Sequence, residues 1–219
     1  MNAQTEYLHM NGPAGVLEVA RDGPSSAHDG TRGTALIAHP HPLFGGTMHN
    51  KVVQTLARAF VQQGWQTVRF NFRGVENSAG VHDNGVGELD DMLAVLAALA
   101  PSGPLCLAGF SFGGFVAAAA LAACHAAGRD VQHGVLVGVA ASRFSVPAVP
   151  PQWQARTLVV HGEADDTVPL SAAMDWARPQ LLPVTVVPDV GHFFHGQLPL
   201  LKSVVLRHID APVALSAPA

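Results

Sequence analysis

Short runs rich in Val, Leu and Ile alternate along this chain with longer, Ala-rich amphipathic runs. The apolar runs at 34–38, 105–110 and 134–140 are continuous, and segments with a helical pattern follow the first two along the chain. This alternation is typical of a parallel sheet whose two faces are both covered by helices. We therefore predict an α/β protein with a mostly parallel, doubly wound sheet of seven to eight strands.

The expected elements follow from this pattern and from the turn signals between the runs. The predicted strands are an opening hairpin within 7–21, then 34–38, 66–72, 105–110, 134–140, 157–161 and 184–187. The predicted helices are 50–63, 86–99, 113–127, 170–181 and 198–209. Segments 22–33 and 142–155 are expected to be a turn and a Pro-rich surface loop, and the tail from about 211 is expected to be frayed.

Composition excludes several classes of protein. The 219 residues suit a single domain, 1–219, and with 48% hydrophobic and 13% charged residues the chain has enough apolar surface to fold. Its 12 basic residues are scattered, which argues against a nucleic-acid partner. The apolar runs are too short to span a bilayer, so no membrane association is expected. The oligomeric state is left open.

The cellular location is predicted from the first residues and the cysteines. Residues 1–12 lack the basic and apolar regions of a secretory signal, which favours a cytoplasmic protein. Cys106 and Cys124 lie in apolar surroundings and are predicted to be buried, reduced thiols.

Ligands of doubly wound sheets bind at the carboxyl ends of the strands, so the residues after each strand carry the information. Gly109-Phe-Ser111-Phe-Gly113 follows a predicted buried strand and opens a predicted helix. Gly-x-Ser-x-Gly in this context is a nucleophile elbow, a sharp turn that projects the serine hydroxyl. Ser111 is the predicted nucleophile, and the backbone N–H of Phe112 is a predicted oxyanion donor.

A nucleophilic serine needs a base and an acid that orients the base, and in folds with this elbow both follow the serine in the chain. The loop after strand 157–161 offers three carboxylates, of which we favour Asp165, with Asp166 second and Glu163 third. The loop after strand 184–187 offers two histidines, of which His192 is the predicted base and His195 the competitor. A further histidine, in the closing helix at position 208, is expected to be exposed.

The second oxyanion donor is expected in the loop His39-Pro-His41-Pro-Leu43, after the first parallel strand. Proline has no N–H, which leaves His41 first and Leu43 second. His39, His41 and His49 could instead form a metal site, but their spacing is not a strong metal signature. We therefore expect no metal and no cofactor, and His39 is expected to bond to backbone groups. Arg73, in the loop after strand 66–72, is expected to anchor that loop.

These residues resemble the α/β-hydrolase superfamily, and within it small bacterial hydrolases that carry a signature of seven motifs. The motifs HPHP, GGTM, NKVV, NFRG, GFSFGG, HGExDxxVP and GH stand at 39–42, 45–48, 50–53, 71–74, 109–114, 161–169 and 191–192. The resemblance covers about residues 7–209. It implies a catalytic triad of Ser111, Asp165 and His192. Glu76 departs from the pattern, because glycine is expected at that position.

The resemblance also implies what the protein acts on. Segment 142–155 is too short and Pro-rich for a helical lid, so no cap domain is expected. The chain is therefore predicted to be a serine hydrolase that cleaves an ester or related acyl bond of a small molecule, as a short-chain carboxylesterase does. A thioesterase or small peptidase using the same triad is one alternative, and a non-catalytic binding protein on a hydrolase fold is another.

Overall fold

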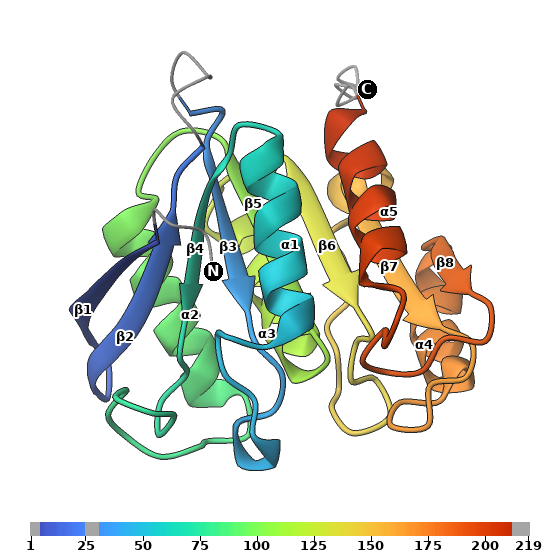
Figure 1. Ribbon diagram of the computed structural model, residues 1–219, viewed down its shortest axis with the longest axis horizontal. Helices are drawn as coiled ribbons and strands as arrows, with labels where there is room; N and C mark the ends of the chain where they lie inside the picture. The colour runs from blue at the N-terminus through green and yellow to red at the C-terminus, as the bar shows by residue number, and fades with distance from the viewer. Residues whose placement is uncertain (1–4, 25–30, 212–219) are drawn as a thin grey trace.

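The computed structural model describes residues 5–24 and 31–211 of the chain. An eight-stranded sheet runs through its centre in the order β1-β2-β4-β3-β5-β6-β7-β8 (Figure 1). Its strands are β1 (Glu6–Gly12), β2 (Gly15–Asp22), β3 (Thr34–Ala38), β4 (Gln66–Phe70), β5 (Leu105–Phe110), β6 (His133–Val137), β7 (Thr157–Gly162) and β8 (Val184–Val187). The predicted sheet of seven to eight strands is confirmed.

The sheet is parallel from β4 to β8, and the opening hairpin β1–β2 adds its two antiparallel strands at one edge. The register pairs Ala38 with Gly109 and Phe110 with Val137. The chain therefore leaves β3, β5 and β6 at the same level of the sheet, and the loops that follow these strands are neighbours.

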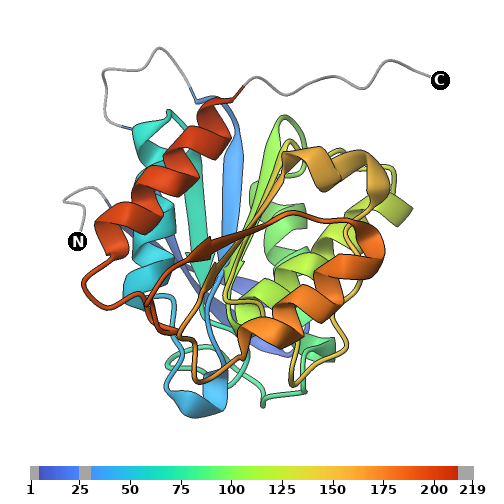
Figure 2. The same cartoon turned by 90° about the vertical axis from the view of Figure 1, so that its right-hand side faces the viewer.

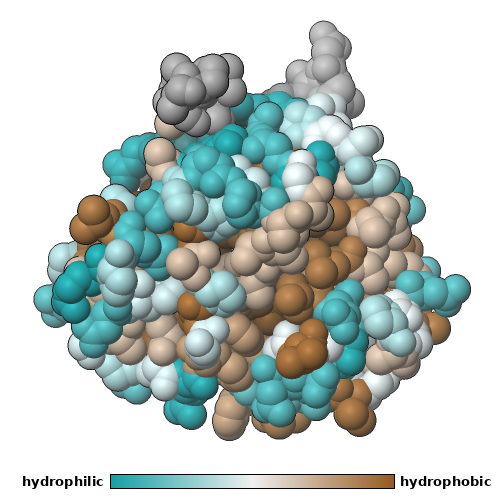
Figure 3. Space-filling view, turned by 180° about the vertical axis from the view of Figure 1, so that it is seen from behind, coloured by the Kyte–Doolittle hydropathy of each residue, from teal (hydrophilic) through white to brown (hydrophobic). Residues whose placement is uncertain are grey.

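Helices cover both faces, as predicted. In Figure 2, α1 (Lys51–Gln62) and α5 (Leu198–Asp210) lie on one side of the sheet. The other side carries α2 (Val86–Leu99), α3 (Phe112–Ala126) and α4 (Leu170–Ala177). Each face has its own buried cluster, anchored by Phe60 and Trp65 on the α1 side and by Phe70 and Phe112 on the other. On the latter face, apolar side chains also reach the surface in the middle of the view (Figure 3).

Several elements match their prediction to the residue, and others end earlier than predicted. β4 ends at Phe70 rather than at 72, because the backbone N–H of Phe72 turns away to bond His39. β6 ends at Val137 because Gly138 adopts a left-handed backbone with φ 53°. α4 ends at Ala177 and continues as a 3-10 turn, Arg178–Gln180, since Pro179 interrupts the α-helical hydrogen bonds.

The expectation that 142–155 is a surface loop is wrong in its second half. Val149 and Trp153 are buried in the core cluster of the α3 face, and Trp153 Nε1 donates to Asp130 at 3.1 Å. Residues Pro151–Arg156 form a 3-10 helix that leads into β7. Between β6 and β7 the described chain therefore has no helical cap, as predicted, but the segment is a packed part of the core.

Some further expectations can be compared with the structure. Cys106 and Cys124 are buried free thiols, and burial raises the pKa of both. The expectation that His208 is exposed is wrong, because this residue is half-buried and its Nε2 donates to the carbonyl of Arg156 at 3.2 Å. Among the described residues, no helix has both the length and the apolar character to cross a bilayer. Residues 25–30 of the predicted turn and the tail from 212 lie outside the described residues.

Candidate active site

Ser111 stands at the turn between β5 and α3 in a strained backbone conformation, φ 58° and ψ −116°. The turn is possible because two glycines lie where a side chain has no room. A Cβ on Gly109 would lie 2.0 Å from the carbonyl oxygen of Gly113, and one on Gly113 would lie 2.3 Å from the carbonyl oxygen of Ala38. The Ser111 N–H donates to Val137 at 2.8 Å, which fixes the turn to the neighbouring strand. These contacts give the physical reason for the Gly-x-Ser-x-Gly spacing.

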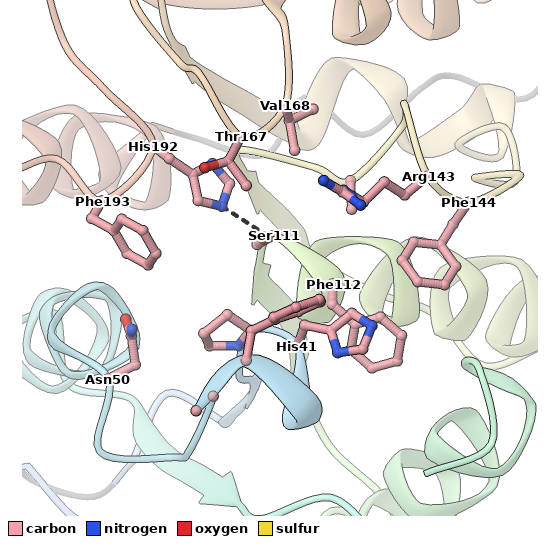
Figure 4. Close-up of a pocket in the computed structure, with 15 residues that line it drawn as sticks. His41, Asn50, Ser111, Phe112, Arg143, Phe144, Thr167, Val168, His192 and Phe193 are labelled. Carbon is pink, nitrogen blue, oxygen red and sulfur yellow. Dashed lines mark hydrogen bonds between the residues drawn. The ribbon is translucent and has the colours of Figure 1, made fainter.

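The Ser111 hydroxyl bonds to the imidazole of His192. The two atoms, Oγ and Nε2, are 2.9 Å apart, and the bond is drawn as a dashed line in Figure 4. The other ring nitrogen, Nδ1, lies 2.7 Å from Oδ2 of Asp165. Since a carboxylate only accepts, Nδ1 carries the proton and Nε2 accepts from the serine hydroxyl. Residues from three separate loops thus form one buried chain of hydrogen bonds.

Asp165 is the carboxylate that the fold brings to His192. Its other oxygen accepts from the backbone N–H groups of Thr167, at 3.0 Å, and Val168, at 2.8 Å. Burial raises the pKa of Asp165, but the hydrogen bonds from His192 and Val168 outweigh burial and leave the pKa below its usual value. The carboxylate is therefore ionised at neutral pH and holds the Nδ1–H tautomer of His192.

The two competing carboxylates lie elsewhere. Asp166 is exposed and accepts from the hydroxyl of the adjacent Thr167 at 3.3 Å. Glu163 is also exposed and accepts from the N–H of Asp189 at 3.2 Å. Each bonds to its own loop or to the neighbouring loop, and neither bonds to His192.

The loop after β8 presents His192 inward and His195 outward. Phe194 anchors this loop, because its ring is fully buried beside α5 and its backbone is left-handed with φ 52°. The ring of Phe110 packs 4.8 Å from the imidazole of His192. His195 is exposed and does not contact Ser111 or Asp165.

Two backbone N–H groups beside Ser111 are free to bind an oxyanion. Within the described chain, neither Phe112 N–H nor His41 N–H has an acceptor, and both residues line the cavity above Ser111. The alternative donor, Leu43 N–H, is turned to Nδ1 of His41 at 3.3 Å. This bond occupies the Leu43 amide, so His41 is the better placed of the two.

The predicted backbone role of His39 is confirmed. This buried residue donates from Nδ1 to the Pro40 carbonyl at 2.6 Å and accepts at Nε2 from Phe72 N–H at 3.0 Å. Burial lowers its pKa to about 3, so the ring is neutral and bonds β3 to the end of β4. With both ring nitrogens occupied, His39 cannot ligate a metal without breaking these bonds. No group of three or more ligating side chains suited to a metal is found among the described residues.

The loop after β4 is held by an ion pair, as predicted for Arg73. Its guanidinium donates to both oxygens of the buried Asp91 in α2, at 3.0 and 2.8 Å. These bonds raise the pKa of Arg73. Glu76, where glycine is expected, has a left-handed backbone with φ 49°, and its carboxylate accepts from Asn71 at 2.6 Å. The glycine preference at this position thus has a backbone cause, and Glu76 does not contact the Ser–His–Asp chain.

The serine opens into a cavity of about 320 Å³ at the carboxyl edge of the sheet. Figure 4 shows His192 and Phe193 on one side of Ser111, Arg143 and Phe144 on the other, and His41 and Phe112 below. The walls are largely aromatic: Phe44, Phe112, Phe144 and Phe193 all line the cavity. Sequence reasoning missed Arg143 and Phe144, although both belong to the segment that follows β6 at the edge of the sheet where ligands bind.

The sheet order, the strand–serine–helix turn and the order of the three hydrogen-bonded residues along the chain define an α/β hydrolase. Comparison with known proteins agrees. The thioesterase-domain family matches residues 50–207. A solved α/β serine hydrolase without a lid, from Xanthomonas campestris, is 36% identical, with 99% of each chain covered and a TM-score of 0.85. The chain belongs to the thioesterase-domain family of α/β hydrolases.

Two other relatives are informative. An α/β serine hydrolase homologue from Coxiella burnetii is 37% identical, with 94% of this chain and 97% of that chain covered and a TM-score of 0.78. An uncharacterised protein from Rickettsia prowazekii (strain Madrid E) is 40% identical over 114 residues. That match covers 50% of this chain and 47% of the other protein, so the chain spans about half the length of the curated relative it matches.

Proposed function

We propose that this protein is a serine hydrolase that cleaves an ester bond in a small molecule through an acyl-enzyme intermediate. The observation that carries the proposal is the buried chain of hydrogen bonds Ser111–His192–Asp165, with 2.9 Å and 2.7 Å between its polar atoms. A serine with a neutral imidazole acceptor and an ionised carboxylate behind it has the arrangement that activates a hydroxyl for acyl transfer.

The mechanism assigns one task to each group. His192 Nε2 takes the proton as Ser111 Oγ attacks the carbonyl carbon, and Asp165 stabilises the resulting imidazolium. The N–H groups of Phe112 and His41 bind the oxyanion of the tetrahedral intermediate. His192 then donates its proton to the leaving group, and water hydrolyses the acyl-enzyme by the reverse sequence. Each step uses the chain's own residues.

Covalent labelling tests the proposal. A fluorophosphonate reacts with an activated serine, so we expect one stoichiometric adduct, located at Ser111 by mass spectrometry. Ser111→Ala should remove both the adduct and the hydrolysis of p-nitrophenyl acetate. A folded protein that forms no adduct would favour the non-catalytic binding protein, and an adduct on another serine would overturn the assignment.

A thioester is the second candidate substrate, and the match to the thioesterase-domain family favours it. The same triad and oxyanion donors serve either bond, so geometry does not separate the two. A matched pair with the same acyl group, such as ethyl butyrate and S-ethyl thiobutyrate, provides the comparison. A higher kcat/KM for the thioester, after correction for its uncatalysed rate, would make the protein a thioesterase. Cleavage of an aminoacyl amide would instead indicate the peptidase alternative.

A further inference from the structure

Arg143 is a charged side chain that lines the cavity of Ser111 without an ionic partner among the described residues. It belongs to the loop after β6, it is exposed, and its side chain extends over the cavity beside Phe144 in Figure 4. No hydrogen bond or salt bridge of its guanidinium to the described chain is formed. Its backbone N–H donates to Ala140 at 3.1 Å, which fixes the position of the residue at the cavity wall.

Most of the other arginine side chains of the described chain form a hydrogen bond or a salt bridge. Five of them pair with carboxylates: Arg21 with Glu6, Arg69 with Asp22, Arg73 with Asp91, Arg156 with Asp130, and Arg178 with Asp175. Arg207, on α5, shares with Arg143 the lack of a side-chain bond within the described chain, but it lies in the last turn of its helix, far from the cavity (Figure 1). Arg143 thus differs from Arg207 in that its guanidinium, without a partner in the described chain, lines the cavity of Ser111.

The electrostatic environment of the cavity is one-sided. Its described lining contains the Arg143 guanidinium and no aspartate or glutamate side chain. The net charge of the whole chain is −4, so this cation is a local exception. The positive charge of Arg143 also acts on His41. Burial is the largest cause that lowers the pKa of His41, His82 and Arg143 lower it further, and Glu88 opposes them. An anionic group entering the cavity therefore meets an attractive charge and no opposing one in the lining.

The geometry of the reaction places this cation at the acyl end of the substrate. His192 must protonate the leaving group, so the leaving group departs on the side of His192 and Phe193. The acyl group then extends to the opposite side of Ser111, where Arg143 and Phe144 lie (Figure 4). An apolar acyl chain would pass the aromatic wall, and a carboxylate at its far end would reach the guanidinium.

Resting on the proposed function, we propose that the preferred substrates are monoesters or monothioesters of short dicarboxylic acids, and that Arg143 is the residue that recognises their free carboxylate. The planar guanidinium offers two parallel N–H groups that match the two oxygens of a carboxylate. Arg143 would act on substrate binding rather than on the chemical step.

The test compares acyl groups of equal length that end either in a carboxylate or in a methyl group. Monoethyl succinate, glutarate and adipate are each paired with the neutral ethyl ester of the same acyl length. We expect the anionic member of at least one pair to have a kcat/KM about tenfold higher, the effect of one charge-assisted hydrogen bond at an exposed site. The preference should lie in KM and should shrink as salt is added.

Three variants assign the preference to the residue. Arg143→Gln should lower kcat/KM for the anionic ester about tenfold more than it lowers kcat/KM for the neutral ester. Arg143→Lys should retain part of the preference, because the charge remains while the paired N–H groups are lost. Arg207→Gln is the matched control and should behave as wild type. An equal rate for anionic and neutral esters, or a preference that survives Arg143→Gln, overturns the proposal.

A binding measurement keeps this test separate from that of the proposed function. In Ser111→Ala, titration calorimetry with monoethyl glutarate and ethyl valerate reports recognition without turnover. Tighter binding of the anionic ester that is lost in the double variant Ser111→Ala/Arg143→Gln supports the inference even if the wild-type protein forms no serine adduct. If Ser111 is labelled and neutral esters are hydrolysed, but anionic esters are not preferred, the proposed serine-hydrolase function is supported. The proposed recognition of a carboxylate by Arg143 is then overturned.

Discussion

Asp165 and Asp166 are adjacent in the chain, yet they differ in burial and in the groups that they bond. Asp165 is buried against His192, whereas Asp166 is exposed and bonds only to its neighbour Thr167 among the described residues. The backbone N–H groups of Thr167 and Val168 hold Asp165 from behind, so its orientation is fixed before any substrate binds.

This difference predicts the outcome of two conservative substitutions. Asp165→Asn should lower kcat for ester hydrolysis by roughly 10⁴-fold, because the neutral amide no longer fixes the tautomer of His192 or stabilises its cation. Asp166→Asn should leave kcat close to wild type. Steady-state kinetics on p-nitrophenyl acetate measure both, and the reverse ranking would move the acid to Asp166. His192→Ala and His195→Ala make the same comparison for the base.

Burial of His39 makes the stability of the fold depend on pH. Its folded pKa of about 3 lies below the ordinary value of 6.5, because burial disfavours the charged ring. Between these two values the unfolded chain binds a proton that the folded chain does not. The contribution of neutral His39 to stability is therefore complete above about pH 6.5 and is lost progressively as the pH falls toward 3.

His39→Gln should remove this part of the pH dependence. We expect the wild-type free energy of unfolding to fall between pH 6 and pH 4 more steeply than that of the variant, by roughly 1.4 kcal/mol per pH unit. His133, whose pKa burial lowers to about 4, contributes to both proteins alike. Urea unfolding over this pH range gives the slopes, with the exposed His195→Gln as the control. Parallel curves for wild type and His39→Gln would show that His39 is not the group responsible.

At the scale of elements, the turn from β5 into α3 depends on close backbone approach. Gly113 lets the first turn of α3 approach the carbonyl of Ala38 at the end of β3. The adjacent Gly114 is less constrained, because the nearest atom to a Cβ there, Cα of Val139, lies at 3.4 Å, an ordinary contact distance. Two neighbouring glycines in one motif thus differ sharply in how much space surrounds them.

Alanine at these two positions should separate the effects. Gly113→Ala places a methyl group 2.3 Å from backbone and should destabilise the protein by about 3 kcal/mol and disrupt the position of Ser111. Gly114→Ala, inside α3, should change the free energy of unfolding only slightly. Alanine has the higher helix propensity, and the contact of its methyl group with Val139 at 3.4 Å can offset that gain. Thermal or urea unfolding measures the difference. A Gly113→Ala protein as stable and active as wild type would contradict the geometry of the turn.

At the scale of the whole molecule, the absence of a helical cap in the described chain leaves the cavity of Ser111 open to solvent on one side. Its aromatic walls enclose about 320 Å³. Phe193 forms part of these walls, whereas its neighbour Phe194 is buried in the core and does not line the cavity. A short acyl group can be covered by this wall, whereas the end of a long one would remain in water.

Neutral esters should therefore show a preference for short acyl groups. Each methylene that becomes buried adds about 0.8 kcal/mol, and that gain ends where the wall ends. We expect kcat/KM for p-nitrophenyl esters to be highest within roughly two to six acyl carbons, and to differ little across that range. A continued rise toward long chains would require a covered apolar groove that this fold does not provide.

The sequence alone determined many of the elements and singled out Ser111 as the candidate nucleophile. Strands 105–110 and 184–187 and helix 86–99 match the structure to the residue, because each is an uninterrupted apolar or amphipathic run bounded by breakers. Ser111 was singled out because the strand–serine–helix turn requires glycines at fixed positions in the chain. Local pattern carries such information, since backbone conformation and hydrophobic period are properties of neighbouring residues.

Only the tertiary structure decided between chemically equivalent candidates. The sequence left three carboxylates, two histidines and two amides open, and the fold selected among them by distance: 2.7 Å joins Asp165 to His192, and a bond to His41 occupies the amide of Leu43. Burial of Trp153 and the unpaired position of Arg143 in the cavity were likewise invisible in the chain. These properties depend on contacts between residues far apart in sequence, which the packing of the sheet and its loops creates.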